Sequence, residues 1–493
     1  MQAKRFLAFD LGAESGRAMV VHFDGKKMLL EELHRFNNAP VRVQNTLHWD
    51  ALNIYKEIRT GLSAYVSKYG SELEGISCDS WGVDYGLLDK HGRLISNPVH
   101  YRDSRTNGIP EKLFNKVSRK EIFNRTGIQI MQINTLFQLF AESKYEHSFL
   151  DQAETMLWMA DLQHYFLSGE KAQEYTLATT SQMIAHQTGD WDRTLIKQCG
   201  IPDSMLPEIV APGSVIGVLT ESLSKELGLR QVPIIASACH DTAAAVAAVP
   251  AKGDDWLFLS SGTWSLLGAE LTSPQVNEKT FQMNFTNEGG VDGTIRFLKN
   301  IMGLWLVQEC RREWERNGEP LTYTQIVDLA NAAAPLVSYV DPNDESFLAP
   351  GDMPNRICDF CKRTRQPIPE TKGAIIRCAL ESLALEYRRS IDFIENVTGK
   401  SFSTLHIVGG GSQNKLLNQF ASDATGKVVI TSPVEATAYG NGLMQAIALG
   451  ILGSLSEARE VVRSSVEVAA YTPTENRNKW DDAYKTFLEL SKR

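Results

Sequence analysis

Short apolar runs separated by turn residues dominate the start of the chain, and their spacing predicts a three-stranded meander. The expected strands cover about residues 4–10, 17–23 and 28–36, with Asp24-Gly25 as the second turn. Asp50 follows as the cap of a long helix. This helix carries apolar residues on one face, namely Ile54, Ile58, Leu62, Tyr65 and Val66.

Strand and helix patterns alternate through the rest of the chain. Strands are expected at Gly75–Asp79 and Val83–Leu88, followed by helices from about 109 to 170. Near residue 250 the order of elements starts again with two hairpin strands. The elements expected from there on are strands 256–260 and 263–271, helices 301–317 and 371–397, strand 404–408, helix 413–424, strand 427–431 and helix 438–450.

A chain of 493 residues exceeds the size of one hydrophobic core, so two domains are expected. We place their boundary near Pro250–Gly253, which gives domains 1–249 and 250–493. Each half starts with strands and continues with helices, which indicates α/β layering around a central mixed sheet in each domain. A cleft between two such domains is a natural ligand site.

Composition and charge narrow the possible partners. The chain is 43% hydrophobic and 22% charged, as in globular proteins, and its formal net charge is −9. This charge argues against a nucleic acid or an anionic membrane as partner. Met1–Arg5 leads into a strand without a signal segment, and no run reaches the ~20 apolar residues of a membrane span. We therefore expect a cytoplasmic protein, a monomer or a small homo-oligomer.

The seven cysteines are scattered and odd in number, which fits a reducing compartment. Cys358 and Cys361 have the spacing of a zinc knuckle or a redox pair, and Cys378 follows. A zinc site would need a second pair of ligands close in sequence, and none is evident. Free thiols are the favoured interpretation, and a Cys361–Cys378 link after oxidation is left open.

Two glycine-bearing segments have the pattern of phosphate-binding hairpins. Asp10–Arg17 follows the apolar run Phe6–Phe9, and Ser260–Ser265 follows the run Trp256–Leu259. A strand that turns at glycine exposes backbone N–H groups and small hydroxyls, which suit anionic oxygens. Two such loops suggest a duplicated fold whose halves bind one polyphosphate. Taken singly, each is equally an ordinary glycine turn.

Within these hairpins, three side chains have both a functional and a structural interpretation. Asp10 either holds a hydrated Mg²⁺ that neutralises phosphate charge or initiates a turn. Arg17 either reaches phosphate or faces solvent from its strand. Thr263 follows Gly262 and either offers an N–H and a hydroxyl to a phosphate or belongs to an ordinary hairpin turn.

Three consecutive glycines, Gly409–Gly411, break the apolar strand Leu405–Val408 before Gln413 and Asn414 open a helix. Such a run is costly in backbone entropy, which favours close contact between the backbone and a flat or charged group. The spacing is neither a dinucleotide-binding fingerprint nor a Walker loop. We interpret the turn as the floor of an adenosine and α-phosphate site centred on Gly410. The alternative is a tight strand-to-helix turn.

Asp241 is the candidate general base. It follows the strand Val232–Ser237 and opens the alanine-rich helix Ala243–Val249. Phosphoryl transfer to an alcohol needs a group that accepts the hydroxyl proton, and a carboxylate at a strand end can supply it. Alternatively Asp241 is a helix cap, or both cap and base, and His240 a structural polar residue. No second ligand lies at helical spacing from His240, so we expect no metal there.

Other polar clusters have side chains that suit a polyol, although each, taken singly, is more often a surface turn or a helix cap than a ligand site. These clusters are Trp81-Gly82 and Tyr101–Arg105 in the first half, and Lys299–Gly303 and Gln308 in the second.

In order along nearly the whole chain, these segments resemble the FGGY carbohydrate kinases of the sugar-kinase and actin-like ATPase superfamily. The resemblance rests on Asp10-Leu-Gly with Arg17, on Ser260–Trp264, and on Gly409–Asn414 with Gln419 and Asp423. It implies two actin-like, ribonuclease H-like ATPase domains with mixed central sheets and a ligand cleft between them. Longer strings narrow the resemblance to one group of ketose kinases: His34–Asn38, Asp79–Asp84, Tyr101–Asn107, Ser181-Gln182, His240–Thr242, Asn287–Gly290, Leu298–Trp305 and Pro433–Ala436.

The resemblance also implies residue roles, with Asp241 as the proton acceptor. The implied sugar contacts are Gly82, His240, Asp241, Thr242 and Asn300. The implied ATP contacts are Ala13, Glu14, Ser15, Gly16, Arg17, Thr263, Gln308 and Gly410. Two positions depart from the family pattern. Gln138 stands where the signature often has a lysine, and Glu14 places a carboxylate near phosphates unless it points outward or toward Mg²⁺.

The implied reaction, in L-rhamnose catabolism, is transfer of the γ-phosphoryl group of ATP, with Mg²⁺, to the C1 hydroxyl of L-rhamnulose. The products would be L-rhamnulose 1-phosphate and ADP. Alternatives are another ketose, such as L-fuculose or L-xylulose, or an actin-like ATPase that is not a kinase.

Overall fold

The computed structural model describes residues 3–431 and 433–490, which divide into two compact units. Unit 1 takes in the chain up to Pro250 together with Leu271–Phe297 and Ala436–Ser465. Unit 2 takes in Ala251–Glu270, Leu298–Glu435 and the chain from Val466 onward. One division thus falls where the sequence places the boundary, whereas two segments of the expected domain 250–493 belong to unit 1.

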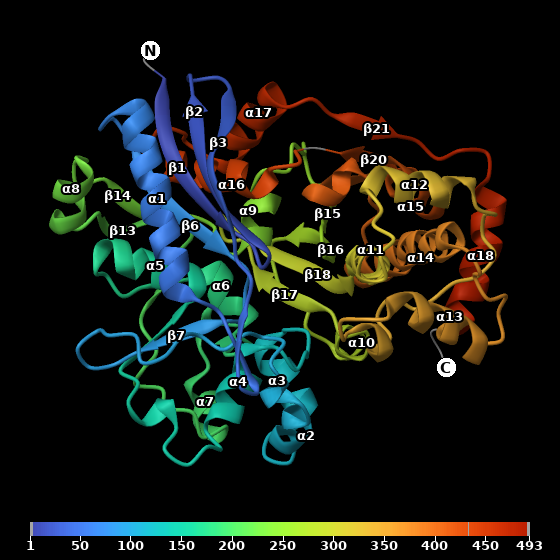
Figure 1. Cartoon of the computed structure of the whole chain (residues 1–493), viewed down its shortest axis with the longest axis horizontal. Helices are drawn as coiled ribbons and strands as arrows, with labels where there is room; N and C mark the ends of the chain where they lie inside the picture. Colours follow the sequence, from blue (N-terminus) through green and yellow to red (C-terminus); the bar gives the residue numbers. More distant parts are fainter. Residues whose placement is uncertain (1–2, 432, 491–493) are drawn as a thin grey trace. The chain divides into compact units, whose positions relative to one another are not determined.

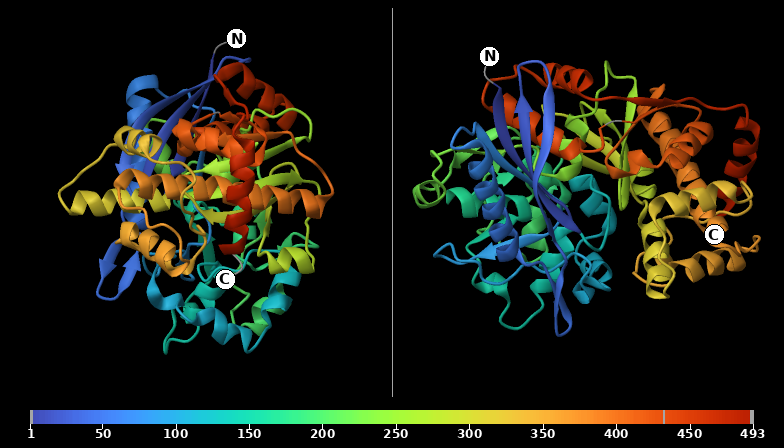
Figure 2. Two further views of the ribbon diagram at one scale, coloured as in Figure 1. Left: turned by 90° about the vertical axis from the view of Figure 1, so that its right-hand side faces the viewer. Right: turned by 45° about the horizontal axis from the view of Figure 1, so that its top comes forward.

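Unit 1 is built on a mixed sheet with the strand order β13-β14-β6-β1-β2-β3. The first three strands form the predicted antiparallel meander and lie side by side, in blue, in both ribbon views (Figure 1, Figure 2). β6 and β14 continue the sheet in parallel, and β13 closes its edge antiparallel. The strands are β1 (Lys4–Leu11), β2 (Ser15–Phe23), β3 (Met28–Asn37), β6 (Gly75–Ser80), β13 (Ser214–Val218) and β14 (Pro233–Ala236).

Helix α1 (Ala51–Tyr69) covers one face of this sheet. It begins where the sequence predicts, because the Asp50 carboxylate accepts the Asn53 N–H at 3.0 Å. Its apolar stripe packs with Leu7 and Phe9 of β1 in the main hydrophobic cluster of the unit. Burial of that stripe, rather than helix propensity, holds α1 in place.

The other face of the sheet is covered by α16 (Ala436–Ala448), from late in the chain (Figure 1). Two glycines of α16 allow its close approach to the sheet and to a neighbouring helix. A Cβ at Gly442 would lie 2.7 Å from Val21, and one at Gly440 would lie 1.8 Å from the Ala244 carbonyl oxygen of α9 (Asp241–Ala247). This close packing is the physical reason why residues 436–465 belong to unit 1.

Unit 2 repeats the architecture. Its strands follow the order β18-β16-β15-β19-β20-β21, with an antiparallel hairpin β15–β16, parallel β19 and β20, and antiparallel β21 at the edge. This order matches β3-β2-β1-β6-β14-β13 of unit 1, so the duplication predicted from the hairpins is confirmed. The strands are β15 (Trp256–Ser261), β16 (Trp264–Leu271), β18 (Ile295–Met302), β19 (Thr404–Val408), β20 (Val428–Thr431) and β21 (Ala469–Tyr471). The first three residues of β18, up to Phe297, belong to unit 1.

Shorter elements complete unit 1. Its remaining helices are η1 (Ser104–Thr106), α2 (Ile109–Phe114), α3 (Arg119–Thr126), α4 (Thr135–Glu142), η2 (Phe149–Asp151), α5 (Met159–Ser168), α6 (Tyr175–Thr180), α7 (Arg193–Gln198), α8 (Glu221–Leu227), α10 (Glu278–Gln282) and α17 (Leu455–Ser465). Its remaining strands are β4 (Val41–Val43), β5 (Thr46–His48), β7 (Tyr85–Leu88), β8 (Thr155–Trp158), β9 (Gln173–Glu174), β10 (Ile184–Ala185), β11 (Asp190–Trp191), β12 (Ile209–Val210) and β17 (Thr286–Gly289).

The helices of unit 2 pack around α14 (Lys372–Thr398), the longest helix, whose apolar stripe is buried as predicted. The others are α11 (Trp305–Arg316), α12 (Tyr323–Ala332), η3 (Glu345–Phe347), α13 (Met353–Arg363), η4 (Gly410–Gln413), α15 (Lys415–Thr425) and α18 (Arg477–Leu490). The helix expected from residue 301 starts at Trp305 instead, because β18 continues to Met302. Among the described residues, no helix combines the length and the apolar character needed to cross a membrane.

Replacing Gly440 with alanine should destabilise the protein, because the added Cβ would overlap the Ala244 carbonyl oxygen and force α16 away from α9. We expect a loss of about 1–3 kcal/mol in the free energy of unfolding, measured by urea denaturation followed by circular dichroism. Gly453→Ala is the matched control, since its Cβ meets only the flexible Glu457 carboxylate, at 3.3 Å. Equal stability of the two variants would contradict this packing.

Candidate active site

The first predicted hairpin joins β1 to β2 in unit 1. The Gly12 N–H donates to the Ser15 carbonyl at 3.0 Å and closes the turn. Gly16 has to be glycine, because a Cβ there would lie 2.1 Å from the Phe36 ring. Asp10 and Arg17 are register partners, and Arg17 donates to Asp10 Oδ2 in a largely buried ion pair. Arg17 therefore lies against Asp10 instead of extending into solvent.

The carboxyl ends of three strands in unit 1 lead to acidic residues. Asp10 on β1 and Asp79 on β6 are register partners, and Asp241 follows β14 directly after His240, which is bridged to Ser80. Parallel strands end at one edge of a sheet, which brings these carboxylates near one another. Burial first, and the charge of Asp10 second, raise the pKa of Asp79 well above its usual range.

Asp241 is the most accessible of these carboxylates, with 35% of its side chain exposed against 11% for Asp10. Its Oδ1 accepts the Thr242 N–H at 2.5 Å and the Thr242 hydroxyl at 3.0 Å. Its Oδ2 makes no hydrogen bond within the described part of the chain. Partial burial raises the pKa of Asp241 to about 6, against the effect of the Thr242 bonds, so the group is mostly ionised at neutral pH.

The alternative prediction, that Asp241 is the N-cap of a helix, is wrong by one residue. His240 occupies the cap of α9 without a capping side-chain bond, and Asp241 is the first residue inside the helix. Its carboxylate binds the next N–H of the first turn, where the end of the helix dipole also favours negative charge. The carboxylate thus satisfies the start of the helix and keeps one oxygen unbound.

His240 lies between Asp241 and a buried charged pair. Its Nε2 is 3.4 Å from Asp241 Oδ1, and its Nδ1 is 3.1 Å from Nη2 of Arg296. Arg296 is fully buried, and it donates to the Gly289 carbonyl at 2.8 Å and lies 3.3 Å from Glu288. Burial, followed by the charge of Arg296, holds the pKa of His240 well below its usual range, so the imidazole is neutral.

A buried network fixes the segment after β6 that contains Gly82. Asp84 accepts hydrogen bonds from the indoles of Trp49 at 2.6 Å and Trp81 at 3.0 Å, and from the Gln138 amide at 3.0 Å. Burial raises the pKa of Asp84 to about 6, against the effect of these donors. Gln138, which stands where the family signature often has a lysine, thus serves as a structural donor.

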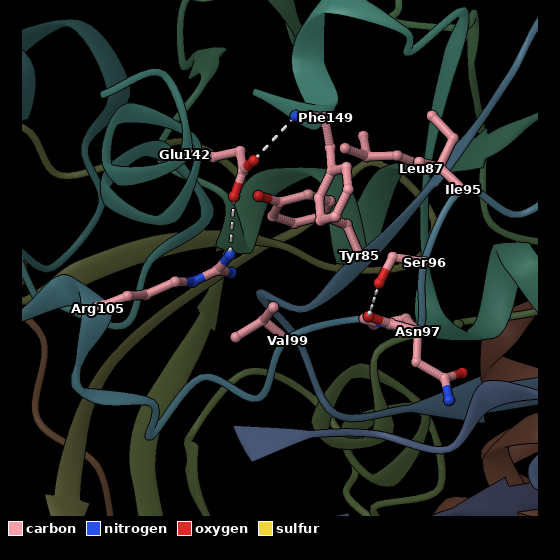
Figure 3. A pocket seen from close by; sticks show the side chains of 10 residues that line it. Tyr85, Leu87, Ile95, Ser96, Asn97, Val99, Arg105, Glu142 and Phe149 are labelled. Atoms are coloured by element: carbon pink, nitrogen blue, oxygen red, sulfur yellow. Dashed lines mark hydrogen bonds and ion pairs between the residues drawn. The ribbon is translucent and has the colours of Figure 1, made fainter. Parts of the chain in front are cut away.

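A small pocket adjoins this network (Figure 3). Arg105 donates to Gln138 at 2.7 Å and lies 3.6 Å from Glu142, and Figure 3 shows the two charged groups facing each other beside the rings of Tyr85 and Phe149. The cavity volume is ≈ 30 Å³, enough for about two water-sized molecules and too small for a sugar. The Arg105 side chain is therefore occupied by its contacts with Glu142 and Gln138. The pocket is too small to be the sugar site.

The second predicted hairpin, in unit 2, turns at Gly262 and Thr263. Their carbonyls accept N–H groups from residues 303–305 at the start of α11, at 3.1 to 3.2 Å. Gly303 has to be glycine there, because a Cβ would lie 2.7 Å from the Ser265 nitrogen. The carbonyls anchor the tip, and the Thr263 hydroxyl makes no hydrogen bond in the described part of the chain.

The glycine run of unit 2 packs against the end of β15. A Cβ at Gly411 would lie 2.0 Å from the Ser261 hydroxyl, and Gly409 adopts a φ of 82°. At the exposed Gly410, by contrast, an added Cβ would meet no atom within 4 Å. Two of the three glycines are thus explained by packing, and only the open backbone at Gly410 suits a ligand.

Two further predicted residues lie in unit 2. Gln308 is on α11, and its buried Oε1 has no hydrogen-bond partner among the described residues. Asn300 is on β18. The Gln308 oxygen is costly to bury without a partner, and a bound ligand or an ordered water would satisfy it.

One group in the described part of the chain has potential metal-binding atoms within 4.8 Å of one another, the buried Asp161, His164 and Cys239. His164 Nε2 accepts the Cys78 N–H at 2.8 Å, so its proton is on Nδ1, which faces Asp161. Burial raises the pKa of Asp161 to about 8 and that of the Cys239 thiol well above its usual range. Protonated groups bind metal poorly, so we interpret this cluster as structural.

All seven cysteines are free thiols, as the sequence predicts. Cys361 and Cys378 lie in hydrogen-bonding contact, and that contact together with burial raises the pKa of Cys378 well above its usual range. A link between them after oxidation stays a prediction.

The residues predicted from the sequence divide between the units. Unit 1 gathers the strand-end and hairpin residues Ala13, Glu14, Ser15, Gly16, Arg17, Gly82, His240, Asp241 and Thr242, of which Glu14 is exposed. Unit 2 holds Thr263, Asn300, Gln308 and Gly410. Sequence reasoning gave no role to Asp79, Glu288 or Arg296. A sequence signal existed for Asp79, which lies at the end of its strand as Asp10 does, and for Arg296, a charged residue among the apolar residues that begin its strand.

Comparison with family models covers most of the chain. A model of the FGGY family of carbohydrate kinases, N-terminal domain, matches residues 5–248, and the model of the C-terminal domain matches residues 257–449.

Similar proteins include three rhamnulokinases. The one from Bacteroides thetaiotaomicron is 41% identical and the alignment covers 98% of this chain and 99% of that protein. The one from Halalkalibacterium halodurans is 40% identical, with 94% and 98% covered. The one from Enterococcus faecalis is 37% identical, with 100% and 99% covered.

Solved structures support the fold. A ligand-bound xylulose kinase from Lactobacillus acidophilus superposes with a TM-score of 0.84 at 15% identity, covering 99% of this chain and 98% of that one. A glycerol kinase from Plasmodium falciparum with ADP superposes with a TM-score of 0.79 at 16% identity, with the same coverage. At these identities the likeness concerns the fold alone.

Trp81→Phe should destabilise the protein more at pH 8 than at pH 5. Asp84 has a folded pKa of about 6, so its carboxylate is charged at pH 8, and losing a donor to a charged group costs about 1.5–3 kcal/mol. At pH 5 the group is mostly protonated and the loss is smaller. Trp191→Phe is the control, since Trp191 donates to the Pro207 carbonyl. The same pH dependence in both variants, measured by urea denaturation, would contradict this account.

Proposed function

The chain belongs to the FGGY family of carbohydrate kinases, and on that premise we propose that it phosphorylates L-rhamnulose at the C1 hydroxyl with ATP. The products are L-rhamnulose 1-phosphate and ADP, in L-rhamnose catabolism. The choice of sugar is supported by relatives named rhamnulokinase that are 36–41% identical over nearly the whole chain. The chemistry rests on one observation, the partly exposed Asp241 carboxylate with an unbound Oδ2.

We propose that the sugar is bound by Gly82, His240, Asp241 and Thr242 of unit 1 and by Asn300 of unit 2. The Asp84 network supports this role of Gly82, because it holds the adjoining Trp81 rigidly. Asp241 supplies a carboxylate that is charged at neutral pH. A base with a pKa somewhat below the working pH combines the correct protonation state with adequate basicity.

We propose that ATP contacts Ala13, Glu14, Ser15, Gly16 and Arg17 of the first hairpin and Thr263, Gln308 and Gly410 of unit 2. The tight turn at Gly12 and the Thr263 hydroxyl supply donors for phosphate oxygens. The open backbone at Gly410 and the buried Gln308 oxygen suit the rest of the nucleotide.

The residues around Asp10 fit a magnesium ion held through water. Arg17 occupies Asp10 Oδ2, and Oδ1 is left without a partner in the described part of the chain, as a hydrogen-bond acceptor for a metal-bound water. Mg²⁺ bound there would neutralise charge on the phosphates. We expect the enzyme to work in the cytoplasm, where ATP is available and its free cysteines stay reduced.

In the proposed step the C1 oxygen attacks the γ-phosphorus in line, and the bond to the β–γ bridging oxygen breaks. The hydroxyl proton passes to Asp241 Oδ2, and ADP leaves with the bridging oxygen. The backbone donors of the hairpins stabilise charge on the transferring group.

Asp241→Asn should abolish sugar phosphorylation, because an amide cannot accept the hydroxyl proton. We expect turnover to fall by a factor of about 10²–10⁴, while ATP binding, measured by calorimetry, persists. Thr242→Val is a milder comparison, since it removes one hydrogen bond to Oδ1 and keeps the base. If Asp241→Asn retained near-full turnover, the base assignment would be wrong.

A coupled ADP-release assay with several sugars tests the substrate. We expect the highest kcat/KM with L-rhamnulose, lower values with L-fuculose and L-xylulose, and little ADP without sugar. A preference for a ketose with a C6 hydroxyl would contradict the proposal, because C6 of rhamnulose is a methyl group. Strong activity without sugar would favour an actin-like ATPase instead.

A further inference from the structure

Arg296 is an unusual residue for its position. It lies near the start of β18 with its side chain fully buried, where a charge is costly unless it is paired and hydrogen-bonded. Three groups surround it: the Gly289 carbonyl, Glu288 and Nδ1 of His240. The Gly289 carbonyl accepts from Nε, Glu288 balances the charge of the guanidinium, and His240, the residue before Asp241, contacts Nη2.

The chemistry of the guanidinium dictates the state of His240. Every nitrogen of arginine donates and none accepts, so a nitrogen 3.1 Å from Arg296 Nη2 must be an acceptor. His240 Nδ1 therefore carries no proton, and the neutral ring has its proton on Nε2. Nε2 lies 3.4 Å from Asp241 Oδ1, so its N–H is a favourable electrostatic neighbour of the carboxylate.

We propose that Arg296 is a positioning residue for the proton acceptor: it fixes His240 in the Nε2–H tautomer, which orients Asp241. The Thr242 N–H and hydroxyl bind Oδ1, and His240 Nε2 lies 3.4 Å from the same oxygen, so Oδ2 is left for the sugar hydroxyl. In the other tautomer a lone pair on Nε2 would face the carboxylate and repel it. This inference rests on the proposed role of Asp241 as base.

Glu288 provides the competing arrangement. Its Oε2 lies 3.6 Å from His240 Nδ1, so an Nδ1–H tautomer could donate to it. That arrangement would place two donors, Nδ1–H and the Arg296 N–H, against each other at 3.1 Å. The shorter distance to Arg296 favours the acceptor state of Nδ1, and Glu288 then balances the arginine charge.

Several charged groups act on Asp241 and set its response to pH. The carboxylates of Asp10 on β1 and Asp79 on β6 disfavour its ionised form, and Arg296 favours it. These neighbours are themselves affected by further charges. Arg17 lowers the pKa of Asp79, and Glu288 and Glu174 raise the pKa of Arg296. Loss of the positive charge of Arg296 should therefore raise the pKa of Asp241, and the activity that needs the ionised base should then be lost at a higher pH.

The tautomer can be measured in the unaltered protein. We would label the full chain with ¹⁵N- and ¹³C-histidine, assign His240 by its disappearance in His240→Gln, and record imidazole correlations from pH 5.5 to 8. We expect a neutral ring with the proton on Nε2 throughout. A proton on Nδ1, or a ring that becomes charged in this range, would overturn the proposal whatever the outcome of the activity assays.

Activity assays of two Arg296 variants test the positioning role. In Arg296→Met we expect kcat about 10–100-fold lower, an unchanged KM for ATP, and an acid limb of kcat/KM moved above the wild-type limb near pH 6. Arg296→Lys keeps the charge, so the limb should return to the wild-type position and part of kcat should recover. A merely structural role would lower stability without moving the limb.

Arg125→Met is the matched control. Arg125 pairs with Asp192 in unit 1, and its loss should change stability but neither kcat nor the acid limb. Wild-type kcat and limb in a folded Arg296→Met would overturn the proposal. If that variant does not fold, the measured tautomer of His240 in the unaltered protein tests the proposal instead. Should Asp241→Asn prove fully active, the proposed base fails, while the tautomer measurement still tests the Arg296–His240 contact by itself.

Discussion

The parallel register of β1, β6 and β14 is the constraint on which the chemistry of unit 1 depends. Because Asp10 and Asp79 are partners across two parallel strands, and Asp241 follows the third, one edge of the sheet receives all three carboxylates. Such a cluster is electrostatically unfavourable, and the groups around it reduce the cost in different ways. Arg17 pairs with Asp10, Asn441 donates to Asp79 at 2.6 Å, and Asp241 keeps partial access to water.

These different solutions give similar side chains different roles. Burial shifts the equilibrium of Asp79 toward its protonated form, where it serves as a packing and hydrogen-bonding group. Asp10 stays next to a permanent cation, which suits an indirect role near a metal ion. Asp241 alone combines access with an unbound oxygen. The environment therefore distinguishes three aspartates that are chemically identical in the sequence, and it favours Asp241 as the proposed base.

The two units use one sheet topology for different chemistry. In unit 1 the strand ends carry carboxylates, with an arginine, a histidine and an amide around them. In unit 2 the corresponding strands β15 and β19 end at Ser261 and Val408, Gly409 follows Val408, and the turns expose backbone and small hydroxyls. Acidic groups suit a sugar hydroxyl and a hydrated cation, whereas uncharged donors and open glycine backbone suit a nucleotide. The duplicated sheets thus present different chemical groups at their strand ends.

The sequence by itself determined the local features: both hairpins, the Asp50-capped helix, the long helix α14, the duplicated order of strands and the family to which the chain belongs. These depend on short-range periodicity and on turn residues, which a sequence displays directly. Only the tertiary structure showed that α16 belongs to unit 1, where Gly440 packs against α9. It alone showed that Arg296 contacts His240, and that Asp79 and Asp241 differ in accessibility. Each of these depends on residues far apart in the chain, whose contacts and burial arise from packing and leave no periodic trace in the sequence.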